Sequence, residues 1–304
     1  MRGMALDAVV LGAAGIDTCV FVQGGDVDLE TDGSFSENLD YVGQAGGFCS
    51  RAFARLGYKT GFIGYVGDDY HGDFLTRELA RDGIELTVFR DPRGTRRSVN
   101  LMLPDGRRHY FFDGKGSMDV QPDTSACRAM LARSRLAHFS IENWCRYLLE
   151  PAGELGVTVS CDLQDLPALG DPYRRDFIEA ADILFFSAAR LDDPVPTVRE
   201  CLRARPDQVV VVGRGPEGCA VGAAGDVQLF PPVDLPLPLL DTNGAGDALA
   251  VGFLASYVLD GLELTESVRR GQAAARYACT QKASTSSLVS RSQLDFLAPQ
   301  LRST

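Results

Sequence analysis

Short runs of consecutive apolar residues alternate along this chain with longer segments whose apolar residues recur at helical spacing. The runs occupy residues 8–11, 60–66, 157–160, 183–186 and 209–212. Most positions within each run are apolar, which is typical of strands that are buried on both faces. Such strands between helical segments predict an α/β fold, with a mostly parallel central sheet covered by helices on both sides.

Two segments depart from this rhythm and predict strands of a different kind. Residues 18–39 are polar, acidic and dotted with glycine. Residues 98–112 surround a Pro-Asp-Gly turn, the pattern of a β-hairpin. No low-complexity linker separates either segment from the rest of the chain. We therefore expect a single domain over residues 1–304, with a small β-sheet lid formed by insertions at about 18–40 and 96–114.

Composition places the chain among ordinary globular proteins. It has 304 residues, of which 45% are hydrophobic and 23% charged, enough apolar material for one large core. Its net charge of −11 opposes binding to nucleic acids and to anionic membranes. No segment of about 18 residues is continuously apolar, so no transmembrane helix is expected. The N-terminal apolar run is interpreted as the first strand and not as a signal peptide.

The eight cysteines are scattered, and no two of them form a CxxC pair. Together with only three histidines, this spacing fits neither a disulfide framework nor a clustered zinc site. We interpret the cysteines as buried free thiols, which are typical of a reducing compartment, and expect a cytoplasmic protein.

A glycine-rich turn that opens directly into a helix is the strongest local signal of chemistry. The backbone N–H groups of Gly244, Ala245 and Gly246 can point at one spot, where the helix dipole also favours an anion. Asp247 follows in the first helical turn, beside that spot. Phosphoryl transfer needs this combination of donors and a base. The alternative, that Asp247 only caps the helix, is weakened by the glycines and by a second acid at Asp241.

A second glycine turn precedes a helix near residue 50. The glycines at 43, 46 and 47 allow either a substrate to approach the backbone or the helix to pack on the sheet. Asp68 and Asp69 precede a helical segment at 70–81, where helix capping is their expected role.

These two segments, residues 43–69 and 241–253, resemble the hallmark motifs of the PfkB carbohydrate kinases, the ribokinase family. The resemblance extends over nearly the whole chain. It implies a ribokinase-like sheet with a β-lid, ATP and Mg²⁺ as cofactors, and Asp247 as the catalytic base. It leaves open whether a monovalent cation is also required, and no metal ligand is assigned.

The resemblance also implies the remaining site residues. The substrate-binding set is Asp17, Gly43, Gln44, Gly47 and Phe48. The ATP-binding set is Asp241, Thr242, Gly213, Gly215, Gly218 and Gln272. In the first set Asp17 is the acid that holds substrate hydroxyls, and in the second the stretch 212–218 faces the phosphates while 271–275 and 280–283 line the adenine.

The sequence departs from the family pattern at several of these positions. Gln44 and Phe48 replace a Gly and an Asn of the substrate pocket, and Gln272 replaces an adenine-side Asn. The Asn-x-x-Glu motif linked to magnesium is Ser187-Ala-Ala-Arg190 here, with a cation in place of the acid. The phosphoryl-transfer residues therefore match better than the substrate pocket does.

Residues 213–218 also read G-x-G-x-x-G, the dinucleotide-binding pattern, but residues 219–230 that follow predict a hairpin and not the required helix. Neither a GxxxxGK[ST] P-loop nor a His-Arg-Asp kinase loop is present. Arg107 and Arg108 are expected to be solvated, with an anionic substrate group as the alternative partner for one of them or for Lys115. Phe111 and Phe112 are expected to pack within the lid, with one of them facing the pocket if the strand alternates.

The sequence thus predicts an ATP-dependent kinase that phosphorylates a hydroxyl of a sugar, a sugar derivative or a nucleoside. Phe48 and the lid aromatics tilt the acceptor slightly toward nucleosides. The alternative is a non-catalytic ligand-binding relative, motivated by Arg190 and Phe48, and a third option, an NAD-dependent dehydrogenase, rests only on the glycine pattern. A homodimer through the lid strands is a further expectation.

Overall fold

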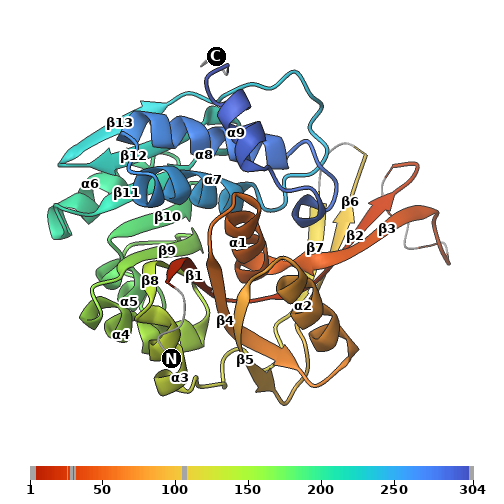
Figure 1. Ribbon diagram of the computed structural model, residues 1–304. Coiled ribbons are helices and arrows are strands. Elements are labelled where there is room, and N and C mark those ends of the chain that lie inside the picture. Colours follow the sequence, from red (N-terminus) through yellow and green to blue (C-terminus); the bar gives the residue numbers. More distant parts are fainter. Residues whose placement is uncertain (1–4, 26, 28–29, 31, 105–107, 301–304) are drawn as a thin grey trace.

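The computed structural model describes residues 5–25, 27, 30, 32–104 and 108–300, and its larger sheet has nine strands (Figure 1). Their order is β13-β12-β11-β10-β9-β8-β1-β4-β5. These strands are β1 (Leu6–Leu11), β4 (Thr60–Gly67), β5 (Glu85–Asp91), β8 (Ser134–Ser140), β9 (Thr158–Asp165), β10 (Ile183–Ser187), β11 (Val209–Gly213), β12 (Cys219–Ala223) and β13 (Asp226–Phe230). The strands from β11 to β5 run parallel, whereas β12 and β13 form an antiparallel hairpin at one edge. The α/β class and all five predicted strand runs are confirmed.

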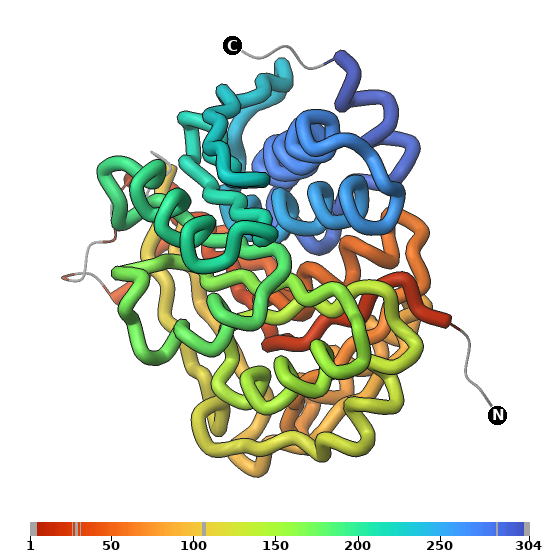
Figure 2. Tube along the Cα trace, turned by 90° about the vertical axis from the view of Figure 1, so that its left-hand side faces the viewer, coloured from red at the N-terminus to blue at the C-terminus, as the bar shows by residue number. Residues whose placement is uncertain are grey.

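Helices cover both faces of this sheet. One face carries α1 (Gln44–Arg55), α2 (Tyr70–Arg81), α7 (Ala245–Leu254), α8 (Leu264–Ala278) and α9 (Arg291–Leu297). The other carries α3 (Thr124–Leu131), α4 (Leu149–Glu154), α5 (Arg175–Ala180) and α6 (Val195–Ala204). Figure 2 shows the green helices and the blue helices on different sides of the sheet. In β1, Val10 packs on the first face and Val9 on the second, which is why the strand is apolar at consecutive positions.

A separate four-stranded sheet stands to one side of the main sheet, at the right of Figure 1, and we call it the lid. Its order is β3-β2-β6-β7. The strands are β2 (Gly15–Val22), β3 (Ser36–Gly43), β6 (Arg97–Met102) and β7 (Arg108–Asp113). The predicted hairpin is confirmed by antiparallel pairing of β6 with β7, although its turn residues 105–107 lie outside the described residues.

The two helix starts near the lid illustrate how local sequence sets the boundaries. Asp69 caps α2, because its side chain accepts a hydrogen bond from the backbone N–H of Gly72 at 2.8 Å, as predicted. Helix α1 begins at Gln44, earlier than the apolar periodicity near residue 50 indicated. Its first turn contains two glycines, and glycine has a low helix propensity, so the sequence masked this start.

Every cysteine is free and buried. Within the part of the chain that the structure describes, no helix combines the length and the apolar character that a bilayer crossing requires.

Candidate active site

The carboxyl ends of the parallel strands meet along one edge of the main sheet, where ligands bind in open α/β folds. Asp162 and Asp165 lie at the end of β9, Ser187 ends β10 and Gly213 ends β11. The N-terminus of α7 faces the same edge, since the Leu249 side chain lies 3.8 Å from where a Cβ of Gly213 would stand. The topology therefore brings acids and a helix N-terminus together.

The loop before α7 is shaped by its own backbone. Gly244 adopts φ 76°, a left-handed conformation that favours glycine, and the helix begins at the next residue. The side chain of Asp241, only 2% exposed, accepts the N–H of Asn243 at 2.8 Å, and the Ala245 N–H donates to the Thr242 carbonyl at 3.3 Å. Asp241 is therefore an organiser of the loop, while Thr242 is exposed beside it.

The backbone donors of the predicted anion site differ from the expected set: the N–H of Ala245 is not available, and the N–H of Asp247 is. The N–H of Ala245 is occupied by the turn, but Gly246 and Asp247 lie in the first helical turn, where N–H groups have no acceptor within the helix. A Cβ on Gly246 would meet no atom within 4 Å, so this side of the helix start is open. An anion can approach the helix N-terminus there.

Asp247 lies in surroundings that favour its protonated form. Desolvation, followed by the negative charge of Asp162, raises its pKa from 3.8 to about 7. The Cys49 thiol, 3.7 Å from Oδ1, partly opposes this by hydrogen bonding. The charge of Asp17, on the lid, also acts on Asp247. A carboxylate with a pKa near neutrality is suited to accept a proton from an attacking hydroxyl.

Asp162 was missed by the sequence reasoning. It is 9% exposed, its Oδ1 accepts the N–H of Gln164 at 2.7 Å, and burial raises its pKa to about 6. Gln164 has φ 60°, and the pairing of β9 with β10 shifts register here, so the strand bends around the carboxylate. The available signal was an acid placed directly after an apolar strand run.

Asp17 and Gly43 meet where β2 and β3 pair across the lid. A Cβ on Gly43 would stand 2.1 Å from Asp17 Cγ, so only glycine leaves room for this carboxylate. Oδ2 of Asp17 accepts the N–H of Gln44 at 3.3 Å, and Oδ1 is buried without a hydrogen bond. Desolvation raises the pKa of Asp17 to about 6. The structure therefore brings three of the predicted substrate residues together.

Gln44 and Gly47 have different surroundings. Both side-chain amide atoms of Gln44 are buried without a hydrogen-bond partner, and φ is 64°. The amide lies against Gly15, where a Cβ would stand 2.4 Å from Nε2. Gly47 instead donates its N–H to the Ala13 carbonyl at 3.1 Å, which fixes α1 against the segment between β1 and β2. For Gly47, packing explains the glycine without a ligand.

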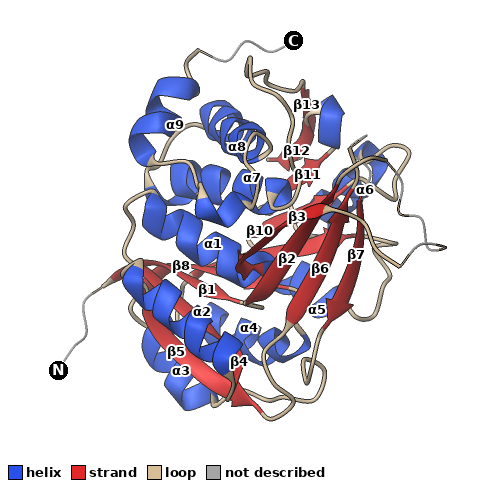
Figure 3. Ribbon diagram, turned by 90° about the vertical axis from the view of Figure 1, so that its right-hand side faces the viewer, coloured by secondary structure: helices blue, strands red, loops and turns tan. Residues whose placement is uncertain are grey.

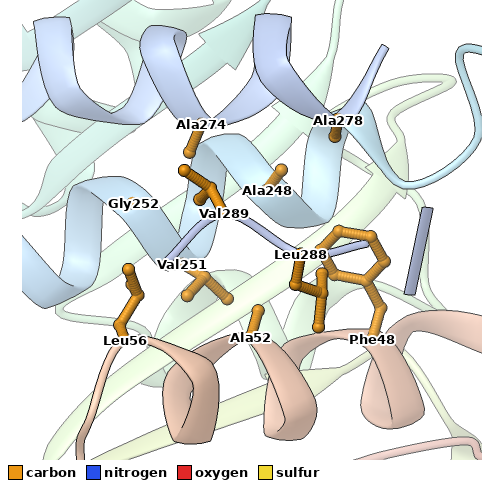
Figure 4. A pocket seen from close by; sticks show the side chains of 10 residues that line it. All are labelled: Phe48, Ala52, Leu56, Ala248, Val251, Gly252, Ala274, Ala278, Leu288 and Val289. Carbon is orange, nitrogen blue, oxygen red and sulfur yellow. The ribbon is translucent and has the colours of Figure 1, made fainter. Parts of the chain in front are cut away.

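Phe48 does not face a substrate pocket. Its ring is 2% exposed and lines a small apolar cavity of about 10 Å³ between α1, α7 and α8 (Figure 4). Leu288 and Val289 complete the lining from the C-terminal side. The expectation that Phe48 offers an apolar face to the acceptor is not supported, because the rotation of α1 turns this position into the core.

The glycine stretch after β11 behaves as the sequence analysis indicated. Gly215 and Gly218 have positive φ values of 57° and 86°, and the antiparallel hairpin β12–β13 follows. Only a single 3-10 turn, Gly215–Glu217, forms here, and no α-helix opens after the glycines, so the dinucleotide-binding geometry is absent from this described stretch. Gln272 is buried, and its Nε2 donates to the Pro231 carbonyl at 2.9 Å. Its amide donor thus tethers the segment after the hairpin.

Arg190 is paired with an acid next to the site. Its Nε lies 2.7 Å from Oδ2 of Asp165, whose Oδ1 lies 2.7 Å from a guanidinium nitrogen of Arg174. Asp165 is therefore neutralised by two arginines and is not available as a lone carboxylate. Among the described residues no group of three His, Cys, Asp or Glu side chains is positioned to hold a metal ion.

The lid contacts the α7 loop directly. Arg108 on β7 donates to the side-chain oxygen of Asn243, whose Nδ2 lies 3.8 Å from Cys19 Sγ and 3.7 Å from Met102 Sδ. Arg108 is thus engaged and not simply solvated, whereas Arg107 lies outside the described residues.

The lid aromatics are not packed as expected. Phe111 is 56% and Phe112 54% exposed, so their predicted role as lid-packing residues is wrong. β7 is an edge strand of the lid, and all six of its residues are exposed. Lys115, the other cation considered for an anionic substrate, pairs with Asp113 at 2.6 Å.

The fold and this site define a class of protein, a small-molecule phosphotransferase with an alcohol group as acceptor. The chain belongs to the pfkB family of carbohydrate kinases, whose family model matches residues 26–291.

Individual proteins of this kind are similar to the chain over most of its length. The chain is 30% identical over 293 residues to the acarbose 7(IV)-phosphotransferase of an Actinoplanes species, covering 95% of this chain and 97% of the relative. It is similar to the structure of a microbiome-derived acarbose kinase, with a TM-score of 0.90 and 32% identity over 98% of this chain and 100% of that chain. An Arabidopsis thaliana ribokinase complexed with ribose and ATP shares the fold, with a TM-score of 0.80 and 21% identity over 97% of this chain and 99% of that one.

Proposed function

We propose that this chain transfers the γ-phosphoryl group of ATP to a hydroxyl group of a carbohydrate, with Asp247 as the general base. The observation that supports it most directly is the position of Asp247. It lies in the first turn of α7, beside the open N-terminus at Gly246, and within electrostatic reach of Asp17 on the lid. A phosphate at the helix start and a hydroxyl held by Asp17 would both adjoin this carboxylate.

The transfer step follows from these positions. The acceptor oxygen forms a bond to the γ-phosphorus as the bond between that phosphorus and the β,γ-bridging oxygen breaks, and ADP leaves. The hydroxyl proton passes to Asp247. The N–H groups of Gly246 and Asp247 stabilise negative charge on the phosphoryl oxygens. Asp17 and the amide of Gln44, with unpaired polar atoms, orient the acceptor.

The donor set near the helix start suits Mg²⁺, which binds through one or two carboxylates together with phosphate oxygens. Asp162 supplies a buried carboxylate whose charge acts on Asp247, and burial raises its own pKa to about 6. Bound there with ATP, Mg²⁺ would offset the charge of the triphosphate. Asp165, already paired with Arg190 and Arg174, is a weaker candidate ligand.

A carbohydrate is favoured over a nucleoside as the acceptor. The tilt toward nucleosides depended on Phe48 and the lid aromatics, and Phe48 is buried in the core, which leaves only the exposed lid rings to support it. Two similar proteins are named for phosphorylating acarbose, and both match this chain over nearly its full length. The acid and amide groups of Asp17 and Gln44 also suit sugar hydroxyls.

Two further proposals concern the state of the protein. A homodimer through the lid would cover the exposed outer strand β7. A cytoplasmic location accords with eight buried free thiols.

The test is a coupled assay of ADP formation with Mg²⁺ and ATP, run with and without K⁺, over monosaccharides, acarbose, maltooligosaccharides and nucleosides. Mass spectrometry should find one added phosphate on the acceptor that turns over. The opposing result is ATP binding without turnover of any acceptor, which would favour the non-catalytic relative and make Arg190 the residue to change first.

A further inference from the structure

β7 is an edge strand of the lid (Figure 3), and all six of its residues are exposed. Residues 109–112 read His-Tyr-Phe-Phe, so the strand carries consecutive rings and has no buried face. A strand normally hides its apolar positions on one side. Clustered exposed aromatic side chains usually mark a binding surface.

Strand pairing shows which rings share a face with the acceptor residues. Side chains of paired residues point to the same side of a sheet. Three such rows cross β2, β6 and β7: Asp17–Ser98–Phe112, Cys19–Asn100–Tyr110 and Phe21–Met102–Arg108. We call the face that carries these rows the inner face of the lid. Tyr110 and Phe112 therefore continue the same surface on which Asp17 lies.

The inner face looks toward the phosphoryl-transfer edge of the main sheet. Arg108, in the third row, donates to the side chain of Asn243 in the loop before α7. Met102 and Cys19, also on the inner face, lie within 4 Å of the same Asn243 side chain, at 3.7 and 3.8 Å. These contacts fix the orientation of β7 relative to the site.

The two faces of β7 differ in how their rings are arranged. On the outer face His109 and Phe111 pack edge to face, with ring centroids 4.9 Å apart. On the inner face Tyr110 is 61% and Phe112 54% exposed. The Phe112 ring lies close to Gly114, where a Cβ would stand 2.9 Å from its Cε1. One side of this ring is therefore supported by backbone while much of it remains open to a ligand.

We propose that Tyr110 and Phe112 form a stacking subsite for the outer sugar rings of an extended acceptor, an oligosaccharide or a large glycoside. This inference rests on the proposed function and specifies the acceptor. A sugar ring presents hydroxyls at its edge and C–H groups on its faces, and an aromatic face attracts the C–H groups while shielding them from water. Asp17, Ser98 and Asn100 supply the polar groups for the ring that reacts.

The spacing of the subsite suits more than one sugar ring. Tyr110 and Phe112 are two residues apart on one strand, so their side chains emerge about 7 Å from each other. Two successive rings of a glycan can rest on such a pair, beginning one strand beyond Ser98 and Asn100. A monosaccharide held at Asp17 would leave this pair uncovered.

The experiment compares acceptor length in matched variants. The wild type is assayed with glucose, maltose, maltotetraose and acarbose, and KM is determined for each. Isothermal titration with a nonhydrolysable ATP analogue present gives Kd for the same sugars. The inner-face variant is Tyr110→Ala/Phe112→Ala, and the control is Phe111→Ala on the outer face of the same strand. Tyr110→Phe/Phe112→Tyr retains the rings and should rescue binding.

The expected result is a wild-type preference for the longest acceptors of tenfold or more, about 1.4 kcal/mol. In the inner-face variant the loss of affinity should grow with acceptor length, whereas Phe111→Ala should match the wild type. A length preference that survives in the inner-face variant, or an equal loss for short and long sugars, would overturn the subsite. So would a purely oligomeric effect, seen as a dimer-to-monomer change by light scattering without a change in length preference.

Failure of the subsite is distinguishable from failure of the proposed function. If glucose is phosphorylated and longer sugars have no advantage, only the subsite is wrong. If no compound in the panel is phosphorylated or bound, the proposed function is wrong as well.

Discussion

The edge of the main sheet and the lid, which the proposed function combines in one site, differ in how they hold their side chains: the edge buries them and the lid exposes them. At the edge, Asp247 and Asp162 are held in dense surroundings that raise their pKa values to about 7 and about 6. On the lid, Tyr110 and Phe112 remain exposed on an outer strand. Proton transfer benefits from desolvation, whereas acceptor recognition needs a surface that stays open until the substrate arrives. Under the proposed function, catalysis and acceptor choice thus fall to regions with different physical demands.

Replacing Asp247 is the most direct test of the role proposed for the buried edge of the main sheet. Asp247→Asn should lower kcat by about 10³, because a general base contributes roughly 10² to 10⁴. The control is Asp73→Asn, an acid in the first turn of α2, which should keep wild-type kcat. Steady-state kinetics and circular dichroism measure the two. A wild-type kcat in Asp247→Asn would rule out the mechanism.

The lid acid should affect the acceptor and not the nucleotide. Asp17→Asn should lower kcat/KM for the sugar by about 10², since a hydrogen bond to a charged group contributes about 1.5–3 kcal/mol. KM for ATP should stay unchanged. The matched control is Asp40→Asn on the other face of the lid, where Asp40 accepts the hydroxyl of Thr18. A fall in kcat with KM for the sugar unchanged would place Asp17 in the transfer machinery instead.

The raised pKa values predict opposite pH trends for activity and stability. Below pH 7, kcat should fall about tenfold per pH unit as Asp247 takes up a proton. Folded-state pKa values of about 6 for Asp17 and Asp162, and about 7 for Asp247, exceed the unfolded value. The folded chain therefore binds more protons between about pH 4 and 7, so the free energy of unfolding falls as pH rises.

Calorimetry of the ligand-free protein from pH 5 to 8 checks the stability trend. Asp247→Asn should unfold at a higher temperature than the wild type at pH 8, by about 2–4 °C, because it removes a desolvated charge. A Tm for this variant below that of the wild type at pH 8 would show that Asp247 stabilises the ligand-free fold.

Replacing Arg190 tests whether this arginine, which stands where the family motif has a Glu, affects Mg²⁺ use at the edge of the main sheet. Arg190→Glu should lower the Mg²⁺ concentration for half-maximal activity about threefold, because it exchanges a positive charge for a ligand-type oxygen. Tm should change little, since the Arg190 side chain is 62% exposed and such ion pairs contribute about 0–1 kcal/mol. Arg128→Glu, at a distant exposed ion pair with Glu154, is the control. An unchanged Mg²⁺ midpoint would remove Arg190 from metal use.

The smallest effect concerns the thiol beside the base. Cys49→Ala removes a donor that lowers the pKa of Asp247, so the midpoint of the kcat profile should move up by a few tenths of a pH unit. Cys49→Ser keeps a donor and should restore the midpoint. A midpoint that moves down in Cys49→Ala would show that burial and not the hydrogen bond dominates this contact.

The elements of the main sheet could be predicted because their cause is local. A strand covered on both faces is apolar at consecutive positions, and the runs near β1, β10 and β11 showed this directly. The hairpin β12–β13 could likewise be distinguished from a dinucleotide fold by its alternation. The start of α1 could not be predicted, because its glycines are required by close packing and not by helix propensity.

The candidate site residues likewise separate into those that a local motif could predict and those that it could not. Asp247 and its glycine loop are contiguous in sequence, so the motif alone was enough to predict a base beside an anion site. Asp162 acquires its role from strands that lie far apart in the chain, and Phe48 loses its expected role through the rotation of a helix. The exposure of Phe112 depends on what covers an outer strand, which no local pattern encodes.

The buried cysteines give the protein a built-in chemical reporter of its own opening. All eight thiols are covered, and burial raises the pKa values of both Cys19 on the lid and Cys127 beneath the main sheet, to about 11 and about 12. A thiol reagent reacts with the thiolate, so labelling requires the chain to open first. Labelling resolved to individual cysteines would thus measure the opening rates of the lid and of the central sheet separately, without any introduced probe.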